Sequence, residues 1–337
     1  MSAPLNRSAF VASAAAFAAT AGRASAGSRD AEPAASPWMR VLLGSAVGQV
    51  PDARAVDADS FRYDGRTYRG RFASVALPDG RIGLLDWVPL EQYLYSVVSR
   101  EIPSSWAPSA LQAQAIVART YALTKQRPGK AYDVVASESD QSYPGIEAET
   151  AQAREAVDAT AGKIVTYEGK PARIAYGSCC GGHTADAAEL WGTAYPYLRG
   201  VPDPYCSPAP DFHWVRTLPY DEFVRALWTV SAGDVDRVEL RDLDSSGRPR
   251  TVALFGARGE TEMKISAFRN ALGTQVVRST LVQSVSVDRN GTVNIAGSGH
   301  GHGVGLCQWG AKYLARGGYD AENVVRFYFP GTAVGSA

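Results

Sequence analysis

Residues 90–103 read LEQYLYSVVSREIP, and this stretch places a carboxylate on the apolar side of a predicted helix. An α-helix turns by about 100° per residue, so Leu94, Val97 and Glu101 project in nearly the same direction. Pro103 stops the helix, which leaves Glu101 in its last turn. The negative end of the helix dipole and an apolar surrounding both disfavour ionisation, so we predict a raised pKa for Glu101. A carboxyl group that stays protonated near neutrality is suited to general-acid catalysis.

Two structural explanations compete with this interpretation of Glu101. The end of the helix can fray and turn the carboxylate to solvent, or Glu101 can form an ion pair with Arg119. The next predicted helix, over residues 109–125, is rich in alanine, and small side chains let two helices approach closely. We therefore expect residues 109–125 to support residues 90–103 as the second member of a central helical pair.

Outward from this pair, groups of short strands alternate with helices. The strands and hairpins are predicted over residues 39–43, 61–63, 67–72, 163–178, 235–255 and 281–295, and two further helices over residues 306–315 and 320–329. The hairpins are indicated by glycine-containing turns between apolar runs. Because the elements lack regular βαβ spacing, the pattern favours an α+β fold with short hairpins and sheets around the helical pair.

The beginning of the chain is typical of an export signal. Arg7 precedes an apolar stretch that is too short to span a bilayer, and Ala24-Ser25-Ala26 follows it as a cleavage site. We predict a secretory signal peptide over residues 1–26, a linker over residues 27–37, and a periplasmic or extracellular location at the cell envelope. A membrane anchor or an alanine-rich tail is the alternative. No later segment reaches transmembrane length, so no transmembrane segment is expected in the mature chain.

Composition and charge indicate a soluble globular protein without a strongly charged partner. The 337 residues are 45% hydrophobic and 20% charged, and 34 basic side chains balance 34 acidic ones. A neutral chain has no electrostatic attraction to nucleic acid or to an anionic membrane as its main partner. We therefore expect neither.

Residues 297–310 read GSGHGHGVGLCQWG and hold two of the four histidines. No Gly-Lys-Ser/Thr follows, as a phosphate loop would need, and a His-x-His pair alone does not complete a zinc site. Alternating glycines let a ligand approach the backbone closely, and His and Gln side chains can bind sugar hydroxyls and amides. In an extended segment, both histidines would point to one face. The run is therefore interpreted as the wall of a binding cleft, with a glycine-rich turn as the alternative.

Several ordered motifs extend from Met39 to Thr332. They are, in chain order, Glu91-x-Tyr93-Leu94, Glu101-Ile102-Pro103, Trp106, Ala113-Gln114-Ala115-x-x-Ala118-Arg119-Thr120-Tyr121-Ala122, Asp140-Gln141-x-Tyr143, Cys180-Gly181-Gly182-His183-Thr184, Gly299-His300-Gly301-His302-Gly303-Val304-Gly305, Gln308-Trp309-Gly310-Ala311 and Phe327-Tyr328-Phe329-Pro330-Gly331-Thr332. Their order resembles the SpoIID/LytB family, named for a stage II sporulation protein and an amidase enhancer. The resemblance implies a SpoIID/LytB-like domain over residues 38–333, within which we expect a β-rich subdomain at about 215–295.

The resemblance also implies a chemistry. Family members of the sporulation type are lytic transglycosylases, which cleave peptidoglycan glycan strands that lack stem peptides. Their catalytic acid is the glutamate of a Glu-x-Pro motif, which here is Glu101. Peptidoglycan strands are accordingly the expected partner, and substrate-binding roles in a glycan groove are expected for His300, His302, Gln308, Arg119 and Tyr143.

One carboxylate suffices for this reaction. Glycoside hydrolases normally use two carboxylates, but in a lytic transglycosylase the 6-hydroxyl of the substrate's own muramic acid attacks C1. The product ends in 1,6-anhydro-muramic acid. Two other functions stay open: a non-catalytic cell-wall-binding enhancer of an N-acetylmuramoyl-L-alanine amidase, as the other family branch implies, and a zinc hydrolase.

The four cysteines are able to bind a metal ion or to form a disulfide. Cys180, His183, Cys206 and Cys307 are a candidate zinc ligand set, while a Cys180–Cys206 disulfide suits an oxidising envelope equally well. Free thiols are the third alternative. Zinc, if bound, is expected to be structural, because a glutamate acid and an internal nucleophile leave it no chemical step, so no cofactor is required for the chemistry.

Overall fold

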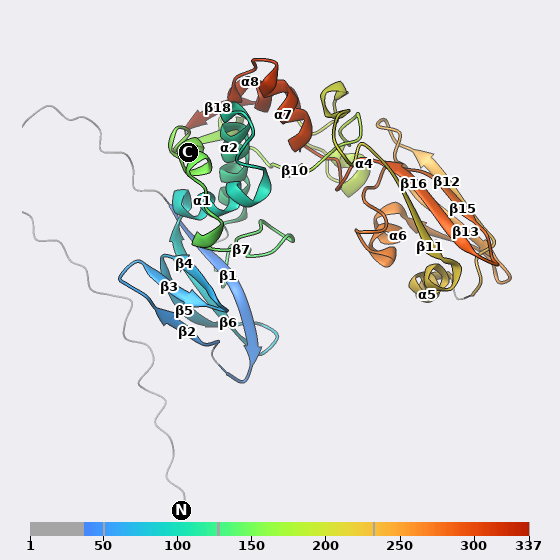
Figure 1. The fold of residues 1–337 in the computed structure, drawn as a ribbon, viewed down its shortest axis with the longest axis horizontal. Helices are drawn as coiled ribbons and strands as arrows, with labels where there is room; N and C mark the ends of the chain where they lie inside the picture. The colour runs from blue at the N-terminus through green and yellow to red at the C-terminus, as the bar shows by residue number, and fades with distance from the viewer. Residues whose placement is uncertain (1–36, 50, 127–128, 232, 337) are drawn as a thin grey trace, which may run out of the picture. The chain divides into compact units, whose positions relative to one another are not determined.

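The computed structural model of the protein describes residues 37–49, 51–126, 129–231 and 233–336. The predicted signal peptide at residues 1–26 and all but the last residue of the predicted linker lie outside these residues. The described chain combines helices with antiparallel and parallel strands, which confirms the α+β class (Figure 1). Three clusters of buried apolar side chains hold its elements together.

The first core is shared by a curved sheet and the helical pair. The sheet has the order β5–β6–β1–β7, made of β5 (Arg71–Ala76), β6 (Arg81–Pro89), β1 (Trp38–Val47) and β7 (Val134–Val135). The small sheet beside it consists of β2 (Ala53–Ala55), β3 (Ser60–Tyr63) and β4 (Arg66–Arg69). Strand β6 runs directly into α1 (Leu90–Glu101), which packs against α2 (Pro108–Lys125) and α3 (Ala151–Asp158). The continuous passage from a buried strand into a helix fixes the direction in which α1 presents its last turn.

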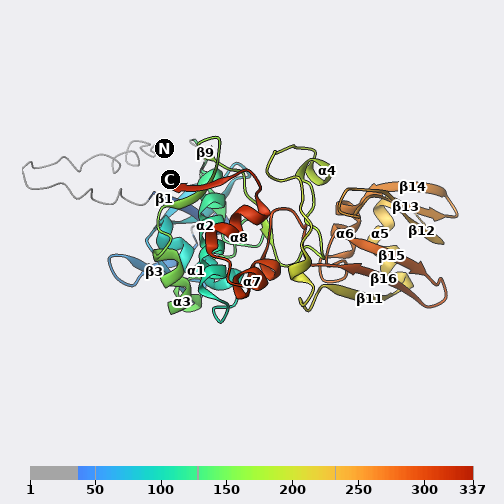
Figure 2. The ribbon, with the colours of Figure 1, turned by 90° about the horizontal axis from the view of Figure 1, so that it is seen from above.

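The second core surrounds the other side of α2. Helices α7 (Gln308–Arg316) and α8 (Ala321–Tyr328) pack against α2, and Figure 2 shows the three side by side. The accompanying strands are β8 (Lys163–Tyr167), β9 (Lys170–Pro171) and β18 (Ala333–Ser336) in one sheet, and β10 (Tyr176–Gly177) with β17 (Leu306–Cys307) in another. The short elements of this region are α4 (Ala187–Trp191) and η2 (Pro204–Cys206), whereas η1 (Ile146–Ala148) lies against α1 and β4 of the first core. All four cysteines belong to this core.

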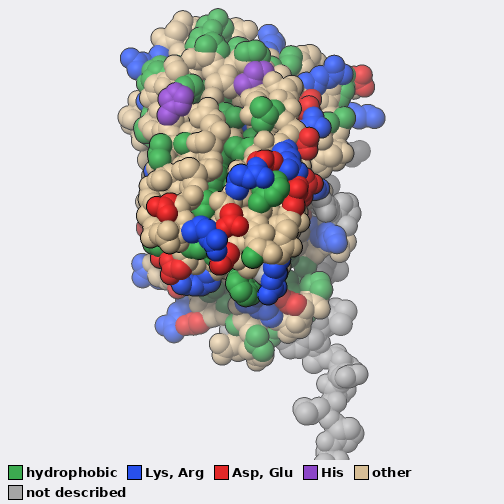
Figure 3. Space-filling view, turned by 90° about the vertical axis from the view of Figure 1, so that its right-hand side faces the viewer, with side chains coloured by type: hydrophobic (Ala, Val, Ile, Leu, Met, Phe, Trp, Pro, Cys, Tyr) green, Lys and Arg blue, Asp and Glu red, His purple; other side chains and the backbone are tan. Residues whose placement is uncertain are grey.

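The third core is built from residues 214–295 alone. One sheet contains β11 (His213–Pro219), β16 (Thr292–Ser298) and β15 (Val282–Val287), and another contains β12 (Arg237–Leu243), β13 (Pro249–Gly256) and β14 (Gly259–Lys264). Helices α5 (Tyr220–Ser231) and α6 (Ile265–Leu272) pack with these strands. Arg241 forms ion pairs with Glu239, Glu260 and Glu262 across one sheet, and acidic and basic side chains are interspersed on the face shown in Figure 3. The β-rich subdomain predicted at about 215–295 falls within these elements.

The helices with strong periodicity lie where the sequence predicts them. The stretches 90–103 and 109–125 correspond to α1 and α2, and 306–315 and 320–329 to α7 and α8. Helices α3, α4, α5 and α6 are not predicted from the sequence. No helix in the described part of the chain is long and apolar enough to cross a membrane.

Candidate functional site

Glu101 is the last residue of α1, at the edge of the first core. Leu94 and Val97 on the same side of the helix are fully buried, whereas Arg100 is exposed. Ile102 adopts an extended backbone and ends the helix. Glu101 therefore lies on the buried side of α1 and not at a frayed end.

Two neutral side chains hold the Glu101 carboxyl. The Gln308 amide donates a hydrogen bond from Nε2 to Oε2 over 3.1 Å, and the Tyr176 hydroxyl donates one to Oε1 over 3.3 Å. Tyr176 lies in β10 and pairs with Leu306 of β17, and the chain passes from β17 into α7 at Gln308. The parallel β10–β17 pair thus brings together two donors that lie more than a hundred residues apart in the sequence.

A relay of hydrogen bonds fixes the direction of the Tyr176 hydroxyl. Tyr93 in α1 donates to the Gln141 carbonyl over 3.2 Å, and the Gln141 amide donates to the Tyr176 oxygen over 2.9 Å. With its oxygen already accepting from Gln141, Tyr176 directs its own proton to Glu101. Gln141 is fully buried, so this relay is protected from water.

Burial raises the pKa of Glu101 above its usual value, and the hydrogen bonds from Gln308 and Tyr176 only partly oppose this effect. The nearby negative charge of Glu138 raises the pKa further, while the positive charge of Arg100 lowers it. The net result is a carboxyl group that keeps its proton to higher pH than a solvated glutamate. This is the direction that the sequence predicts.

A pocket of about 760 Å³ opens at the Glu101 carboxyl, and we call it the Glu101 pocket. Among the residues that line it are Glu101, Tyr176, His300, His302 and Gln308, with Glu138 as a second, exposed carboxylate. A smaller pocket of about 350 Å³ shares Tyr176 and His302 with it. The structure therefore brings three of the predicted substrate-binding residues together with the predicted acid.

The two histidines of the glycine-rich run differ in environment. The His300 ring contacts Asp211, with 3.0 Å between Nδ1 and Oδ2. Burial lowers the pKa of His302 to about 4, so its ring is neutral at physiological pH, and its Nδ1 accepts the Val304 amide over 2.9 Å. His302 also packs against the Trp191 ring, with 5.2 Å between centroids.

The run is not a regular extended strand, because its alternate glycines take positive φ. Gly299, Gly301, Gly303 and Gly305 have φ between 76° and 107°. A Cβ at Gly305 would overlap the Ala175 carbonyl, and one at Gly303 would overlap the Arg248 guanidinium. Close approach thus explains these two glycines, although it is approach by the protein's own groups rather than by a ligand.

Arg119 and Tyr143, the two other predicted substrate-binding residues, lie away from the Glu101 pocket. Arg119 is fully buried and forms a two-pronged ion pair with Glu91, with Nη2 2.6 Å from Oε2 and Nε 2.8 Å from Oε1. It therefore pairs with Glu91 and not with Glu101. Tyr143 is buried, and its hydroxyl donates to Asp86 over 2.9 Å. A buried guanidinium or phenol needs such internal partners, so both side chains are directed into the core.

The structure adds residues that the sequence reasoning missed. Tyr176 and Asp211 contact Glu101 and His300, yet neither lies in a quoted motif. Gln141 belongs to the Asp-Gln-x-Tyr motif, from which the resemblance favours Tyr143 instead. Its place in that motif is the signal that points to Gln141, but periodicity does not reveal which polar residue of a loop faces inward.

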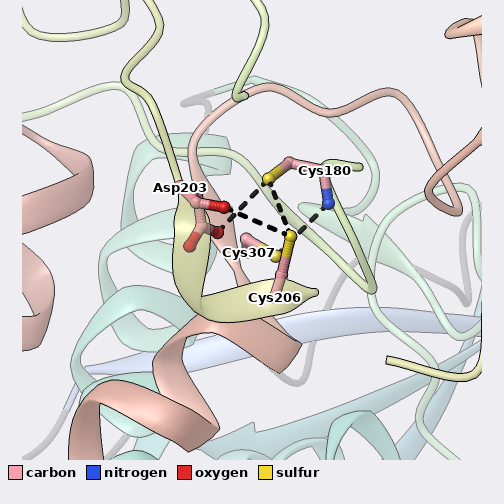
Figure 4. Close-up of side chains that lie close together, drawn as sticks. All are labelled: Cys180, Asp203, Cys206 and Cys307. Carbon is pink, nitrogen blue, oxygen red and sulfur yellow. Dashed lines mark hydrogen bonds between the residues drawn. The ribbon is translucent and has the colours of Figure 1, made fainter. Parts of the chain in front are cut away.

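Three cysteines and one aspartate form a second polar cluster, shown in Figure 4. Cys180, Asp203, Cys206 and Cys307 are buried, and their ligand atoms all lie within 4.8 Å of one another. All four cysteines of the chain are described, and each is a free thiol in this structure. His183, a predicted ligand, is not in the cluster, since its Nδ1 lies 2.7 Å from the Thr184 carbonyl oxygen. Asp203 occupies the fourth position instead.

Comparison with known proteins extends over most of the chain. The SpoIID family, described as stage II sporulation protein, matches residues 78–167. The stage II sporulation protein D of Bacillus amyloliquefaciens is 32% identical over 268 residues, which cover 74% of this chain and 75% of that protein. An uncharacterised protein of Brachyspira hyodysenteriae is 32% identical over 281 residues, or 82% and 74% of the two chains. The amidase enhancer of Bacillus subtilis is 29% identical over 293 residues, which cover 72% of this chain but 40% of that protein. The chain therefore belongs to the SpoIID family.

Proposed function

We propose that the protein is an exported peptidoglycan lytic transglycosylase that uses Glu101 as its general acid and base. The observation that carries the proposal is the Glu101 carboxyl itself, whose pKa is raised by burial and which lies at the wall of a pocket large enough for sugar residues. The substrate would be strands of alternating MurNAc and GlcNAc denuded of stem peptides. Membership of a family that includes stage II sporulation protein D supports a role at the cell wall.

In the first step, Glu101 gives its proton to the leaving glycosidic oxygen as the bond from that oxygen to C1 of MurNAc breaks. The resulting carboxylate is then stabilised by hydrogen bonds from Gln308 and Tyr176, both of which already point at it. In the second step, the 6-hydroxyl of the same MurNAc attacks C1 and returns its proton to Glu101. The product carries a 1,6-anhydro ring, and Glu101 is restored.

The neutral hydrogen-bond partners of Glu101 suit both steps of the proposed reaction. A cation beside Glu101 would lower its pKa and remove the proton that the first step needs. Gln308 and Tyr176 stabilise the carboxylate more weakly than a charge would, so the group can lose and regain a proton. His302, neutral because of burial, lines the same pocket without adding a positive charge.

The decisive experiment incubates the purified protein with denuded glycan strands and identifies the products by mass spectrometry. Products with anhydro-muramic ends are expected. Glu101→Gln should lower the rate at least about 100-fold while glycan binding persists, because the shape of the side chain is kept and only the proton is lost. An active Glu101→Gln protein would overturn the mechanism.

Glu138 provides a matched control, since it is the second glutamate at the Glu101 pocket but is exposed. Glu138→Gln should leave the anhydro product and most of the rate intact. If both variants are inactive and wild-type products carry reducing ends, the enzyme is a two-carboxylate hydrolase instead.

Similarity to the amidase enhancer of Bacillus subtilis favours a second function, a wall-binding protein that stimulates an amidase. The product assay on glycan strands distinguishes the transglycosylase function from the enhancer function. A protein that binds strands, releases no product and accelerates a purified cell-wall amidase would support the enhancer function.

A further inference from the structure

Ligand atoms from three separate segments converge in the second core. Cys180 follows β10, Asp203 and Cys206 stand at either end of the η2 turn, and Cys307 ends β17. Cys180 and Cys307 are 127 positions apart, yet the Cys180 amide donates to the Cys307 sulfur over 3.3 Å. Three sulfurs and one carboxylate oxygen within 4.8 Å of one another match the ligand number and chemistry of a tetrahedral zinc site (Figure 4).

Asp203 shows what a cation would supply to this cluster. Its side chain is fully buried, and its carboxylate accepts hydrogen bonds from the Cys180 thiol, the Tyr328 hydroxyl and the Tyr205 amide, over 3.0 to 3.2 Å. Within the described residues, no Lys, Arg or His side chain forms an ion pair with it. Burying a carboxylate without a positive partner costs several kcal/mol, and buried charges are normally paired or bound to a metal.

We infer that Cys180, Asp203, Cys206 and Cys307 bind one zinc ion in a closed structural site. Zinc supplies the positive charge that Asp203 lacks. The inference departs from the ligand set expected from sequence, because Asp203 takes the place of His183. It concerns metal binding alone and does not depend on the proposed glycan chemistry.

Backbone donors converge on the Cys307 sulfur and fix its position in the cluster. Its sulfur accepts backbone hydrogen bonds from Cys180 and from Gly310 over 3.3 and 3.4 Å. Cys307 is also the N-cap residue of α7, so the start of this helix holds the sulfur in place. A Cβ at Gly310 would overlap the Asp203 carboxylate and the Tyr328 hydroxyl, so glycine is required for the carboxylate to reach the sulfurs.

The site would fix part of the Glu101 pocket. Cys307 immediately precedes Gln308, the donor to Glu101, and Cys180 lies two residues after Ser178, which lines the pocket. Four protein ligands leave no open coordination position for a substrate. The ion would therefore act by joining the β10 and β17 segments to the η2 turn.

The test measures metal in the purified full-length chain by inductively coupled plasma mass spectrometry after dialysis against metal-free buffer. We expect about one zinc per chain, lost in Cys180→Ala. His183→Ala is the control, because His183 lies next to the cluster in sequence but outside it in the structure, and it should retain zinc. Absence of zinc from the wild-type chain, or loss of zinc in His183→Ala but not in Asp203→Ala, would overturn the assignment.

A variant that keeps the fold guards against misfolding as the cause of metal loss. Tyr328→Phe removes only the hydroxyl that bonds Asp203, and should weaken zinc affinity by about 10–100-fold in competition with a chelator. Unchanged affinity in Tyr328→Phe would contradict a role for Asp203. Alkylation of the denatured, chelated chain should label all four cysteines, whereas two unreactive cysteines would show a disulfide and exclude the zinc site.

Discussion

At the scale of single residues, the proposed reaction depends on the proton of Glu101, whose pKa is raised by burial. Because the pKa of Glu101 is raised, its acid form is present at low pH and is lost as pH rises through that pKa. The basic limb of the activity profile should therefore report Glu101. The hydroxyl of Tyr176 opposes burial, since its hydrogen bond stabilises the carboxylate.

Tyr176→Phe should move this basic limb to higher pH. The substitution removes a hydrogen bond that lowers the pKa of Glu101, so the proton is held more tightly. The measurement is the pH dependence of kcat/KM on denuded strands. Tyr95→Phe makes the same change on α1, where the hydroxyl bonds Asp158 instead, and should not move the limb. A limb that moves to lower pH in Tyr176→Phe would contradict this account of the site.

At the scale of elements, the glycine–histidine run is shaped by close packing as well as by φ. The buried Arg248 side chain donates to the carbonyls of Cys180 and His183, and its guanidinium lies against Gly303. Gly301, two residues earlier, has open space where a Cβ would be. Both glycines have positive φ, 107° at Gly301 and 80° at Gly303, so a side chain is strained at either position.

Gly303→Ala should therefore destabilise the protein more than Gly301→Ala. The left-handed conformation alone costs an alanine about 1–2 kcal/mol at either position. At Gly303 the new methyl group must also displace a buried guanidinium, which should add about 1–3 kcal/mol. Urea unfolding measures the free energy of unfolding of both variants. Equal losses of stability would mean that the Arg248 side chain moves aside without cost.

The helical pair depends on a buried ion pair for its alignment. Glu91 of α1 and Arg119 of α2 are joined by two hydrogen bonds, and the Arg119 side chain is fully buried. Arg119 further donates to the Val157 and Lys163 carbonyls, which connects α1 and α2 to the end of α3 and to β8.

Glu91→Leu should lower the free energy of unfolding by about 3–5 kcal/mol, because it leaves the Arg119 guanidinium buried without its carboxylate. Asp221→Leu breaks an exposed pair with Arg225 and should cost less than about 1 kcal/mol. Chemical denaturation of the two variants gives the comparison. A small loss of stability in Glu91→Leu would show that water reaches the Arg119 guanidinium.

At the scale of the whole molecule, the inferred zinc site lies in the second core, between segments that are distant in sequence. Removal of zinc with a chelator should lower Tm by roughly 5–15 °C, since a ligand present at 1,000 times its Kd contributes about 4 kcal/mol. The pH dependence of activity in the fraction that stays folded should not move, because zinc has no step in the proposed reaction. Loss of activity at an unchanged Tm would instead make the metal catalytic.

The sequence alone determined what depends on neighbours in the chain. The apolar spacing of residues 90–103 fixed the helix and the side on which Glu101 lies, because each residue of a helix turns by a constant angle. The same local information predicted α2, α7 and α8. Ordered motifs identified the family, and with it Gln308 and the two histidines as residues of one site.

Only the tertiary structure decided which distant side chains meet. Tyr176 reaches Glu101 because β10 pairs with β17, and Asp203 joins the cysteines because the η2 turn folds onto the end of β17. Arg119 and Tyr143 are in family motifs, yet the need to satisfy a buried charge and a buried hydroxyl directs them into the core. Contacts across 75 to 127 residues follow from packing and strand pairing, which no local pattern encodes.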